Sequence, residues 1–274
     1  MERPNPVVAV ANQSSYRVPD AQIAICVEHG GAAVLCVTAG KVGRKGRKAA
    51  FGATLFWVTC PNLNNIIARL ERHGAVGAVQ SLINNDCDVS EAHVASHLHY
   101  EKRAKELLDP ERWKLFDAHF GAGAVDSPRG RKYGNAAVSH ATDIKCLHAL
   151  VAQSLCGAPN PIGDAVLRYV LVMAERVRLF KSSQRTCCAH EDNCERIACS
   201  GMDDRNDKLI LEEDMLMDST SLAEFVRRFV LEKENHVCDS SGEVNADSFC
   251  SAALEVVTFL DGRPPKARKK YRIN

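Results

Sequence analysis

The sequence predicts an α+β fold, in which a small N-terminal antiparallel sheet packs against a mainly helical body with a helical C-terminal extension. Near the N-terminus two short apolar runs flank a Gly-Gly pair, which is the pattern of a β-hairpin. After residue 61, apolar residues recur with the period of amphipathic helices. The chain has 274 residues, 46% of them hydrophobic and 25% charged, which fits one large globular domain with an appendage.

The predicted sheet draws on three segments. Residues 22–27 and 32–38 are the two apolar runs, and Thr54–Cys60 has the strongest strand character because aromatic and β-branched residues fill it. Pro61 favours a helix start directly afterwards. Cys60 therefore lies at a strand-to-helix junction, where a helix N-terminus can lower the pKa of a thiol. A buried, inert cysteine is the alternative interpretation.

A short helix is expected over residues 75–83, and a longer one from Ser90, as its N-cap, to about Leu108. In the longer helix His93 and His97 are four residues apart and share a face, a spacing that permits two ligands on one metal ion. The same face continues with Tyr100 and Arg103. No glutamate follows His93 as the zinc-peptidase helix requires, so hydrogen-bonded histidines on an ordinary helix are the alternative.

The stretch from Ser139 to Asp164 concentrates the chemistry of the chain. Lys145, Cys146 and His148 lie near the start of a predicted helix that Thr142 or Asp143 caps. In a regular helix Cys146 and His148 diverge by roughly 200°, so they reach one metal ion only if the helix begins later. Lys145 and His148 beside the free N–H groups of a first turn suit an anion better.

A second helix is expected after Gly157, where Asn160-Pro-Ile-Gly precedes an amphipathic run that ends at Phe180. Composition then becomes polar. We predict a core domain over residues 1–181, a flexible Cys-rich insert over 182–207, a helical extension over 208–262 and a basic tail over 263–274. The helices of the extension, near residues 221–236 and 247–260, are expected to pair with each other.

Composition restricts the compartment and the partners. The chain has no run of about 18 apolar residues and no charged-then-apolar leader, so we expect no membrane partner and no secretion. Twelve scattered cysteines then indicate reduced thiols in the cytoplasm or the nucleus. The net charge of +1 excludes a strongly basic nucleic-acid binder as a property of the whole protein.

Four motifs in order resemble the family called domain of unknown function 501, a mainly bacterial single-domain family. They are Leu55–Pro61 (LFWVTCP), the helix bearing His97, Tyr100 and Arg103, Lys145–Leu150 (KCLHAL) and Asn160–Asp164 (NPIGD). The resemblance covers roughly residues 21–180. The resemblance implies where a site lies, but it implies no activity for that site. The chain departs from the family in the basic glycine loop Lys41–Lys48 and in everything after Lys181.

The first functional hypothesis is an anion-binding or catalytic pocket, with a phosphate-containing molecule or zinc as its ligand. The predicted catalytic residues are Cys60 as nucleophile, His148 as base and Lys145. The predicted substrate-binding residues are His97, Tyr100, Arg103 and Asn160. The predicted zinc ligands are Cys60, His97, Cys146 and His148.

The second hypothesis is a module that binds RNA or a ribonucleoprotein. Clustered Lys and Arg residues recruit phosphate chains. Such clusters occur at Lys41–Lys48, at Arg129–Lys132 and in the C-terminal tail. In that case the cysteines and histidines belong to the core.

Overall fold

A computed structural model describes residues 25–26, 31–36, 54–120, 130–188, 211–232 and 246–265. Strands come first in the chain: β1 (Ile25–Cys26), β2 (Gly31–Ala32), β3 (Val34–Cys36) and β4 (Phe56–Val58). Helices follow: α2 (Pro61–Arg72), α3 (Ala75–Asn85), α4 (Cys87–Leu107), α5 (Pro110–Phe120), α6 (Leu147–Leu155), α7 (Pro161–Cys188), α8 (Glu213–Leu216), α9 (Ser219–Leu231) and α10 (Asp247–Asp261).

The prediction of an α+β fold is wrong, because the described part of the chain is mainly helical. Its strands are two or three residues long and form two separate antiparallel pairs, β1 with β2 and β3 with β4. Segments this short offer no continuous apolar face on which helices could pack. The apolar residues that indicated strands instead enter a helical core, as Val34, Leu55 and Phe56 do.

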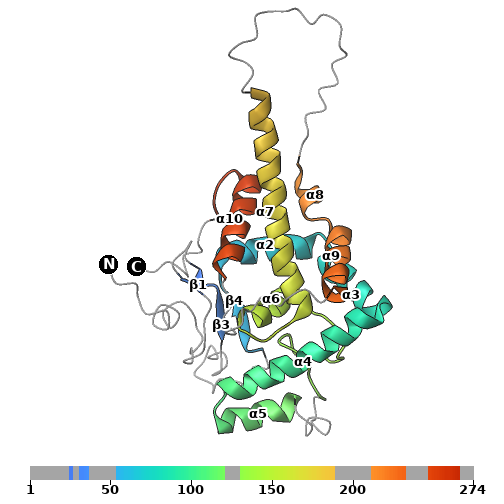
Figure 1. Cartoon of the computed structure of the whole chain (residues 1–274). Helices are drawn as coiled ribbons and strands as arrows, with labels where there is room; N and C mark the ends of the chain where they lie inside the picture. The colour runs from blue at the N-terminus through green and yellow to red at the C-terminus, as the bar shows by residue number, and fades with distance from the viewer. Residues whose placement is uncertain are drawn as a thin grey trace, which may run out of the picture.

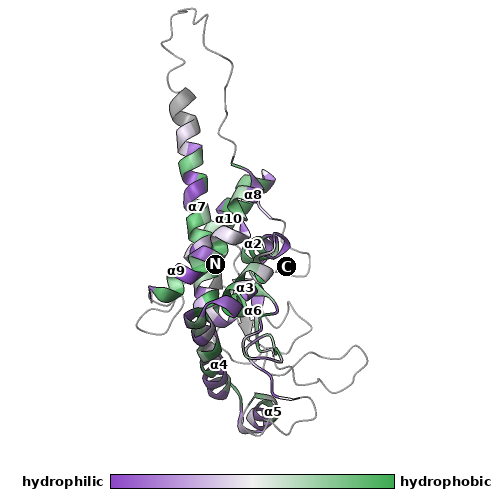
Figure 2. Ribbon diagram, turned by 90° about the vertical axis from the view of Figure 1, so that its right-hand side faces the viewer, coloured by the Kyte–Doolittle hydropathy of each residue, from purple (hydrophilic) through white to green (hydrophobic). Residues whose placement is uncertain are grey.

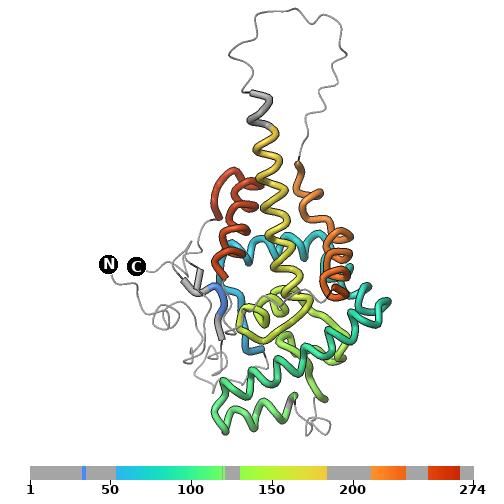
Figure 3. Tube along the Cα trace, viewed as in Figure 1, coloured from blue at the N-terminus to red at the C-terminus, as the bar shows by residue number. Residues whose placement is uncertain are grey.

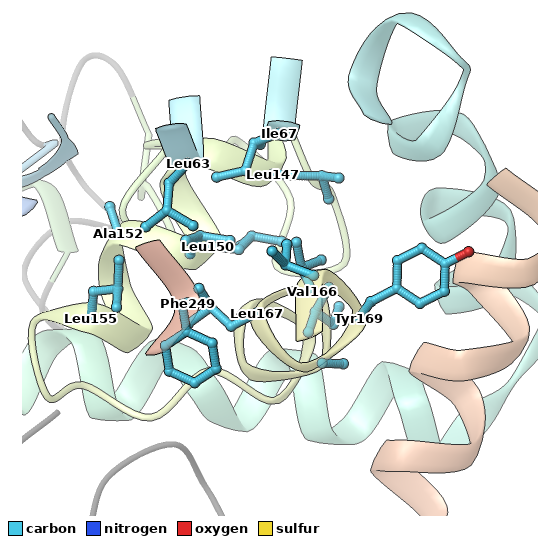
Figure 4. Close-up of a cluster of buried hydrophobic side chains, with 14 of the residues drawn as sticks. Leu63, Ile67, Leu147, Leu150, Ala152, Leu155, Val166, Leu167, Tyr169 and Phe249 are labelled. Atoms are coloured by element: carbon cyan, nitrogen blue, oxygen red, sulfur yellow. The ribbon is translucent and has the colours of Figure 1, made fainter. Parts of the chain in front are cut away.

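Helix α7 is the element around which the others pack. It contacts α6, α9 and α10, and α10 also packs on α2 (Figure 1). Figure 4 shows the core where four helices meet, to which Leu63 from α2, Leu150 from α6, Val166 from α7 and Phe249 from α10 all contribute. At about 25 cal/mol per Å² of buried apolar area, such a cluster is the main source of stability.

The motif Asn160-Pro-Ile-Gly fixes the crossing of α6 and α7. The side-chain oxygen of Asn160 accepts a hydrogen bond from the N–H of Gly163 at 2.9 Å, which is N-cap geometry, and Pro161 is the first helical residue. A Cβ on Gly163 would lie 2.6 Å from the carbonyl carbon of Leu150. Only glycine allows the two helices to approach this closely, so the motif is explained by packing.

The C-terminal helices differ from the prediction in their contacts. The expected helices near residues 221–236 and 247–260 exist as α9 and α10. They were expected to pair, but α9 packs on α3 and α7 whereas α10 packs on α7 and α2. They therefore lie on opposite sides of α7 in Figure 1 and in the perpendicular view of Figure 2. Helix α7 itself continues to Cys188, into the segment expected to be a flexible insert.

Arg69 on α2 joins the C-terminal helices to the rest of the fold. Its guanidinium is largely buried and forms ion pairs with Glu213 of α8, at 2.6 Å, and with Asp261 at the end of α10. Among side chains, only the planar guanidinium of arginine has N–H donors arranged to bind two carboxylates in this way.

The domain boundaries at 181, 207 and 262 stay a prediction. No helix among the described residues combines the length and the apolar character that crossing a bilayer demands.

Candidate functional site

The first turn of α6 begins later than the sequence predicts. The helix starts at Leu147, and Cys146 before it is extended, with φ −160° and ψ 151°. The expected caps Thr142 and Asp143 therefore precede the helix by several residues. Because Cys146 lies outside the helix, the 100° rotation per residue no longer separates it from His148. Both side chains contribute to the lining of one hollow.

Glu71, at the end of α2, caps this helix from a distant part of the chain. Its Oε1 accepts from the backbone N–H of Leu147 at 2.7 Å and of His148 at 3.3 Å. The same oxygen lies 3.0 Å from Nδ1 of His148. A carboxylate only accepts, so Nδ1 carries a proton, while Nε2 lies 3.4 Å from the carbonyl oxygen of Asn64, a longer and weaker contact. Sequence reasoning missed Glu71, because nothing near residue 146 points to residue 71.

A hollow of about 430 Å³ opens beside His148, within the range of small-molecule sites. We call it the tryptophan hollow. One wall comes from β4 and the other from the start of α6, with contributions from α2 and from the turn before α6. Its lining residues are Thr54, Phe56, Trp57, Val58, Asn64, Ala136, Lys145, Cys146, His148 and Ala149.

A second and larger hollow of about 840 Å³ shares Val58, Asn64 and His148 with the first, so the two adjoin at His148. We call it the arginine hollow. The outer face of α2 and the residues that follow α10 form its walls. Its remaining lining residues are Thr59, Pro61, Asn65, Ala68, Glu71, Arg72, Asp261, Arg263, Pro264 and Pro265.

Some charged side chains around the two hollows have ion-pair partners, and others have none among the described residues. Glu71 is engaged with α6 and His148, and Asp261 is engaged with Arg69. Within the described residues no carboxylate forms an ion pair with Lys145, Arg72 or Arg263. The hollows therefore carry an excess of unpaired positive charge.

The pKa values of two groups in the site are displaced. Burial raises the pKa of Glu71, but hydrogen bonds and the charge of His148, together with the N–H groups of α6, outweigh it, so that the pKa lies below its usual value. Burial raises the pKa of the Cys146 thiol, and the carboxylate of Glu71 adds to this, whereas the N–H of Ala149 and the charge of Lys145 act in the opposite direction. Cys146 is thus a protonated thiol at neutral pH and a poor nucleophile.

Cys60 lies in the core and lines neither hollow, although its neighbours Thr59 and Pro61 line the arginine hollow. It is 0% exposed, and its N–H donates to the carbonyl of Ala33 at 3.1 Å. It does occupy the expected strand-to-helix junction, directly before Pro61 of α2. Neither lining includes Cys60, so we do not carry it into the proposal below as a nucleophile.

His93 and His97 hold the segment that leads into α6. Nε2 of His97 lies 2.7 Å from the carbonyl oxygen of Ala141. Nε2 of His93 lies 3.3 Å from the carbonyl oxygen of Asp143. Figure 3 shows this segment in yellow-green, close to helix α4. Carbonyl oxygens only accept, so both Nε2 atoms carry the proton. Burial lowers the pKa of both imidazoles, that of His93 to about 4.

Helix α4 begins at Cys87, one turn before the predicted start, because its N-cap is Asp86 and not Ser90. The side chain of Asp86 accepts a hydrogen bond from the N–H of Val89 at 3.2 Å. Farther along, Tyr100 is buried and its hydroxyl accepts from the N–H of Leu55 at 3.2 Å. Arg103 donates to the carbonyl of Cys156 at 3.0 Å.

None of the four predicted substrate-binding residues, His97, Tyr100, Arg103 and Asn160, lines either hollow. Their contacts are with the fold itself. That role stays a prediction for them, and the proposal below does not use it.

The predicted zinc ligands do not assemble. Among the described residues no three His, Cys, Asp or Glu side chains are placed to hold a metal ion, and this includes the set Cys60, His97, Cys146 and His148. Imidazole Nε2 of His97 is already committed to a backbone carbonyl. We do not propose zinc further.

Most of the segments behind the RNA hypothesis lie outside the described residues, namely the loop Lys41–Lys48, Arg129 and the tail beyond Pro265. The Cys-rich residues beyond Cys188 lie outside as well. Two described cations of the second basic segment have partners within the chain. Arg131 pairs with Glu101 at 3.0 Å, and Lys132 donates to Ser139 at 2.8 Å.

Comparison with known proteins gives one match. The model of a family described as a protein of unknown function (DUF501) matches residues 23–168, more than half of the chain. No curated protein and no solved structure matches significantly. The matched range contains β4, α2 and the start of α6, and so every lining residue of the tryptophan hollow, whereas Asp261, Arg263, Pro264 and Pro265 of the arginine hollow lie beyond it.

Proposed function

This chain belongs to the DUF501 family of proteins of unknown function, as its motifs indicated, and because that family assigns no reaction, we propose that the two hollows adjoining at His148 bind a small anionic substrate. In this proposal His148 is the acid–base group, and Lys145 supplies positive charge that no carboxylate among the described residues pairs with. The single observation that carries it is the 3.0 Å contact between Glu71 and Nδ1 of His148, placed at the shared edge of both hollows.

The Glu71–His148 contact supports acid–base work. A carboxylate on one imidazole nitrogen fixes the ring orientation, and the other nitrogen exchanges a proton with a ligand once its long 3.4 Å contact with the carbonyl of Asn64 gives way. The His148 side chain is 27% exposed, so a ligand can reach it. The raised pKa of Cys146 argues against a thiolate mechanism, and Cys146 is therefore a wall residue in this proposal.

The charge distribution supports an anion. Lys145, Arg72 and Arg263 line the hollows without a carboxylate partner among the described residues, whereas the two lining carboxylates, Glu71 and Asp261, are engaged. Phosphate and carboxylate groups are the usual anions of such sites. We further propose a reducing compartment, the cytoplasm or the nucleus, since Cys60, Cys87, Cys146, Cys156 and Cys250 are free thiols.

Binding of inorganic phosphate and pyrophosphate to the full chain tests the proposal, by calorimetry and by the shift in Tm. Lys145→Ala and His148→Ala should each weaken binding at least about tenfold, since each removes a charge-assisted contact worth ~1.5–3 kcal/mol. Lys114→Ala is the matched control, because Lys114 is an exposed lysine on α5 and lines neither hollow.

Two results would overturn the proposal. One is that neither phosphate probe binds the unmodified chain. The other is that Lys145→Ala and His148→Ala bind as tightly as Lys114→Ala does, which would place the anion elsewhere.

A further inference from the structure

Trp57 is the one large aromatic side chain that β4 turns outward. It is 41% exposed, whereas Phe56 before it is 1% exposed. Successive residues of a strand point to opposite faces, so burying Phe56 in the core directs Trp57 away from it. Exposing an indole costs hydrophobic free energy, and in this fold the exposed residue lines a hollow.

The tryptophan hollow has two chemically different walls. The wall from β4 is apolar, and its exposed side chain is that of Trp57, since Phe56 and Val58, which also border the hollow, alternate to the opposite face of the strand. From the start of α6 and the two residues before it come Lys145, which supplies positive charge and N–H donors, and His148 beside it. A ligand that suits both walls is therefore apolar on one side and anionic on the other, and a flat ring fits the face of an indole.

We propose that the ligand is a phosphorylated heteroaromatic compound, with a nucleoside monophosphate as its simplest form, whose ring stacks on Trp57 and whose phosphate meets Lys145 and His148. This rests on the function proposed above, since it names the substrate class of the same site. Indole faces bind every base, because stacking needs only a π surface. Asn64 also lines the hollow, and because its amide nitrogen donates to the carbonyl of Val58 at 3.0 Å, its Oδ1 is the atom left to accept from a ring amine or a sugar hydroxyl.

The adjoining arginine hollow indicates how the ligand extends. Arg72 and Arg263 line it, and Asp261–Pro265 form part of its wall from the C-terminal extension. A nucleotide with more than one phosphate would reach past His148 toward these guanidiniums. Nucleoside diphosphates should then bind more tightly than monophosphates.

Intrinsic fluorescence tests the inference directly, because the chain has only two tryptophans, Trp57 and Trp113. Trp113 stacks on Phe116 of α5, at a centroid distance of 5.4 Å, and lines neither hollow. Trp113→Phe leaves Trp57 as the only reporter, and Trp57→Phe leaves Trp113 as the matched control. The probes are adenosine 5′-monophosphate, ribose 5-phosphate, adenosine and inorganic phosphate.

We expect the adenosine monophosphate to quench Trp57 in the Trp113→Phe chain and to leave Trp113 unchanged in the Trp57→Phe chain. It should bind about tenfold more tightly than ribose 5-phosphate, which lacks the ring. Trp57→Ala should remove that advantage and keep the affinity for inorganic phosphate. Trp57→Phe retains a ring and should keep part of the advantage, which separates stacking from a general loss of folding.

The outcomes distinguish the inference from the proposed function. If ribose 5-phosphate binds as tightly as adenosine monophosphate, or if Trp57→Ala keeps the difference, the ring does not stack on Trp57 and only the anion site remains. If none of the phosphate probes binds, both proposals fail. If a single-stranded oligonucleotide quenches Trp57 and the mononucleotides do not, the inference is overturned in favour of RNA binding.

Discussion

The histidines of α4 and the histidine of α6 occupy opposite environments. His97 is 5% exposed, and its Nε2 donates to the carbonyl of Ala141. His148 is partly exposed at the edge of two hollows, and its Nδ1 faces the carboxylate of Glu71. The α4 histidines are thus fixed by backbone carbonyls inside the core, whereas His148 pairs with a carboxylate where solvent and both hollows meet. Partner and burial, more than residue type, therefore separate the structural histidines from the candidate site histidine.

The two environments also differ in what surrounds the second ring nitrogen. Nδ1 of His93 and of His97 is buried with no hydrogen-bond partner among the described residues. A Cβ on Gly134, whose φ is +61°, would lie 2.9 Å from Nδ1 of His97, so backbone packs directly on that ring. In His148 both ring nitrogens have partners instead: Nδ1 faces the carboxylate of Glu71 at 3.0 Å, and Nε2 lies at the longer distance of 3.4 Å from the carbonyl oxygen of Asn64.

The largest expected effect is on folding. His97→Ala should lower the free energy of unfolding by about 3 kcal/mol, because it removes a buried hydrogen bond and leaves a cavity against His93 and Tyr133. Denaturant titration measures the change. Phosphate binding by the folded fraction should stay at the level of the unmodified chain. A loss of phosphate binding with unchanged stability would reverse the assignment of the two environments.

A second effect appears on acidification. The pKa of His93 is lowered from 6.5 to about 4, so the unfolded chain binds a proton that the folded chain does not. Stability should be complete above pH 6.5 and fall as the pH drops toward 4, by on the order of 3 kcal/mol if His93 titrates as a single group. The lowered pKa of His97 acts in the same direction.

The variant His93→Gln distinguishes the loss of stability between pH 6.5 and 4 from losses caused by other groups. Glutamine keeps an N–H donor for the carbonyl of Asp143 and cannot titrate. The variant should show a flatter dependence of stability on pH between 6.5 and 4. Glu71, whose pKa is lowered from 4.5, loses its contribution only as the pH falls below that value. An unchanged slope in His93→Gln would mean that His93 is not the group that takes up the proton.

The third effect concerns the cap of α6. Glu71→Gln replaces a charged acceptor of two backbone N–H groups by a neutral one and should cost about 1 kcal/mol. Hydrogen exchange of the Leu147 and His148 amides should become faster, while that of α7 stays unchanged. Glu106→Gln is the matched control, since Glu106 pairs with Arg103 at the surface. Equal costs for the two variants would show that Glu71 does not act as a cap.

Helices were predictable from local pattern, and their partners were not. The helix start at Pro61 and the helix over Asp247–Asp261 follow from proline, capping and periodicity, and the structure confirms them. The expected sheet failed because strand propensity is a local signal, whereas a sheet needs several long strands that find each other. The separation of α9 and α10 depends on which apolar face meets α7, which the period alone does not specify.

The site was predictable in part for the same reason. Lys145, Cys146 and His148 stood out by residue type, and all three line the tryptophan hollow. The cap that positions them comes from Glu71, 76 residues before Leu147, and the late start of α6 depends on it. The motif Asn160-Pro-Ile-Gly was conspicuous, but the structure explains it by a helix cap and a close helix crossing.

The smallest expected effect on stability, that of His148→Ala, is the strictest test of the difference between His148 and the histidines of α4. His148→Ala removes a partly exposed ring and one contact with Glu71, which keeps its two backbone partners, so unfolding should become easier by less than about 1 kcal/mol. Without ligand, the Tm of the variant should therefore nearly equal that of the unmodified chain. With saturating phosphate the two should separate, because only the unmodified chain gains stability from binding, by RT ln(1 + [L]/Kd). If His148→Ala instead costs as much as His97→Ala in the absence of phosphate, His148 supports the fold as the α4 histidines do, and the Glu71 contact is a structural one.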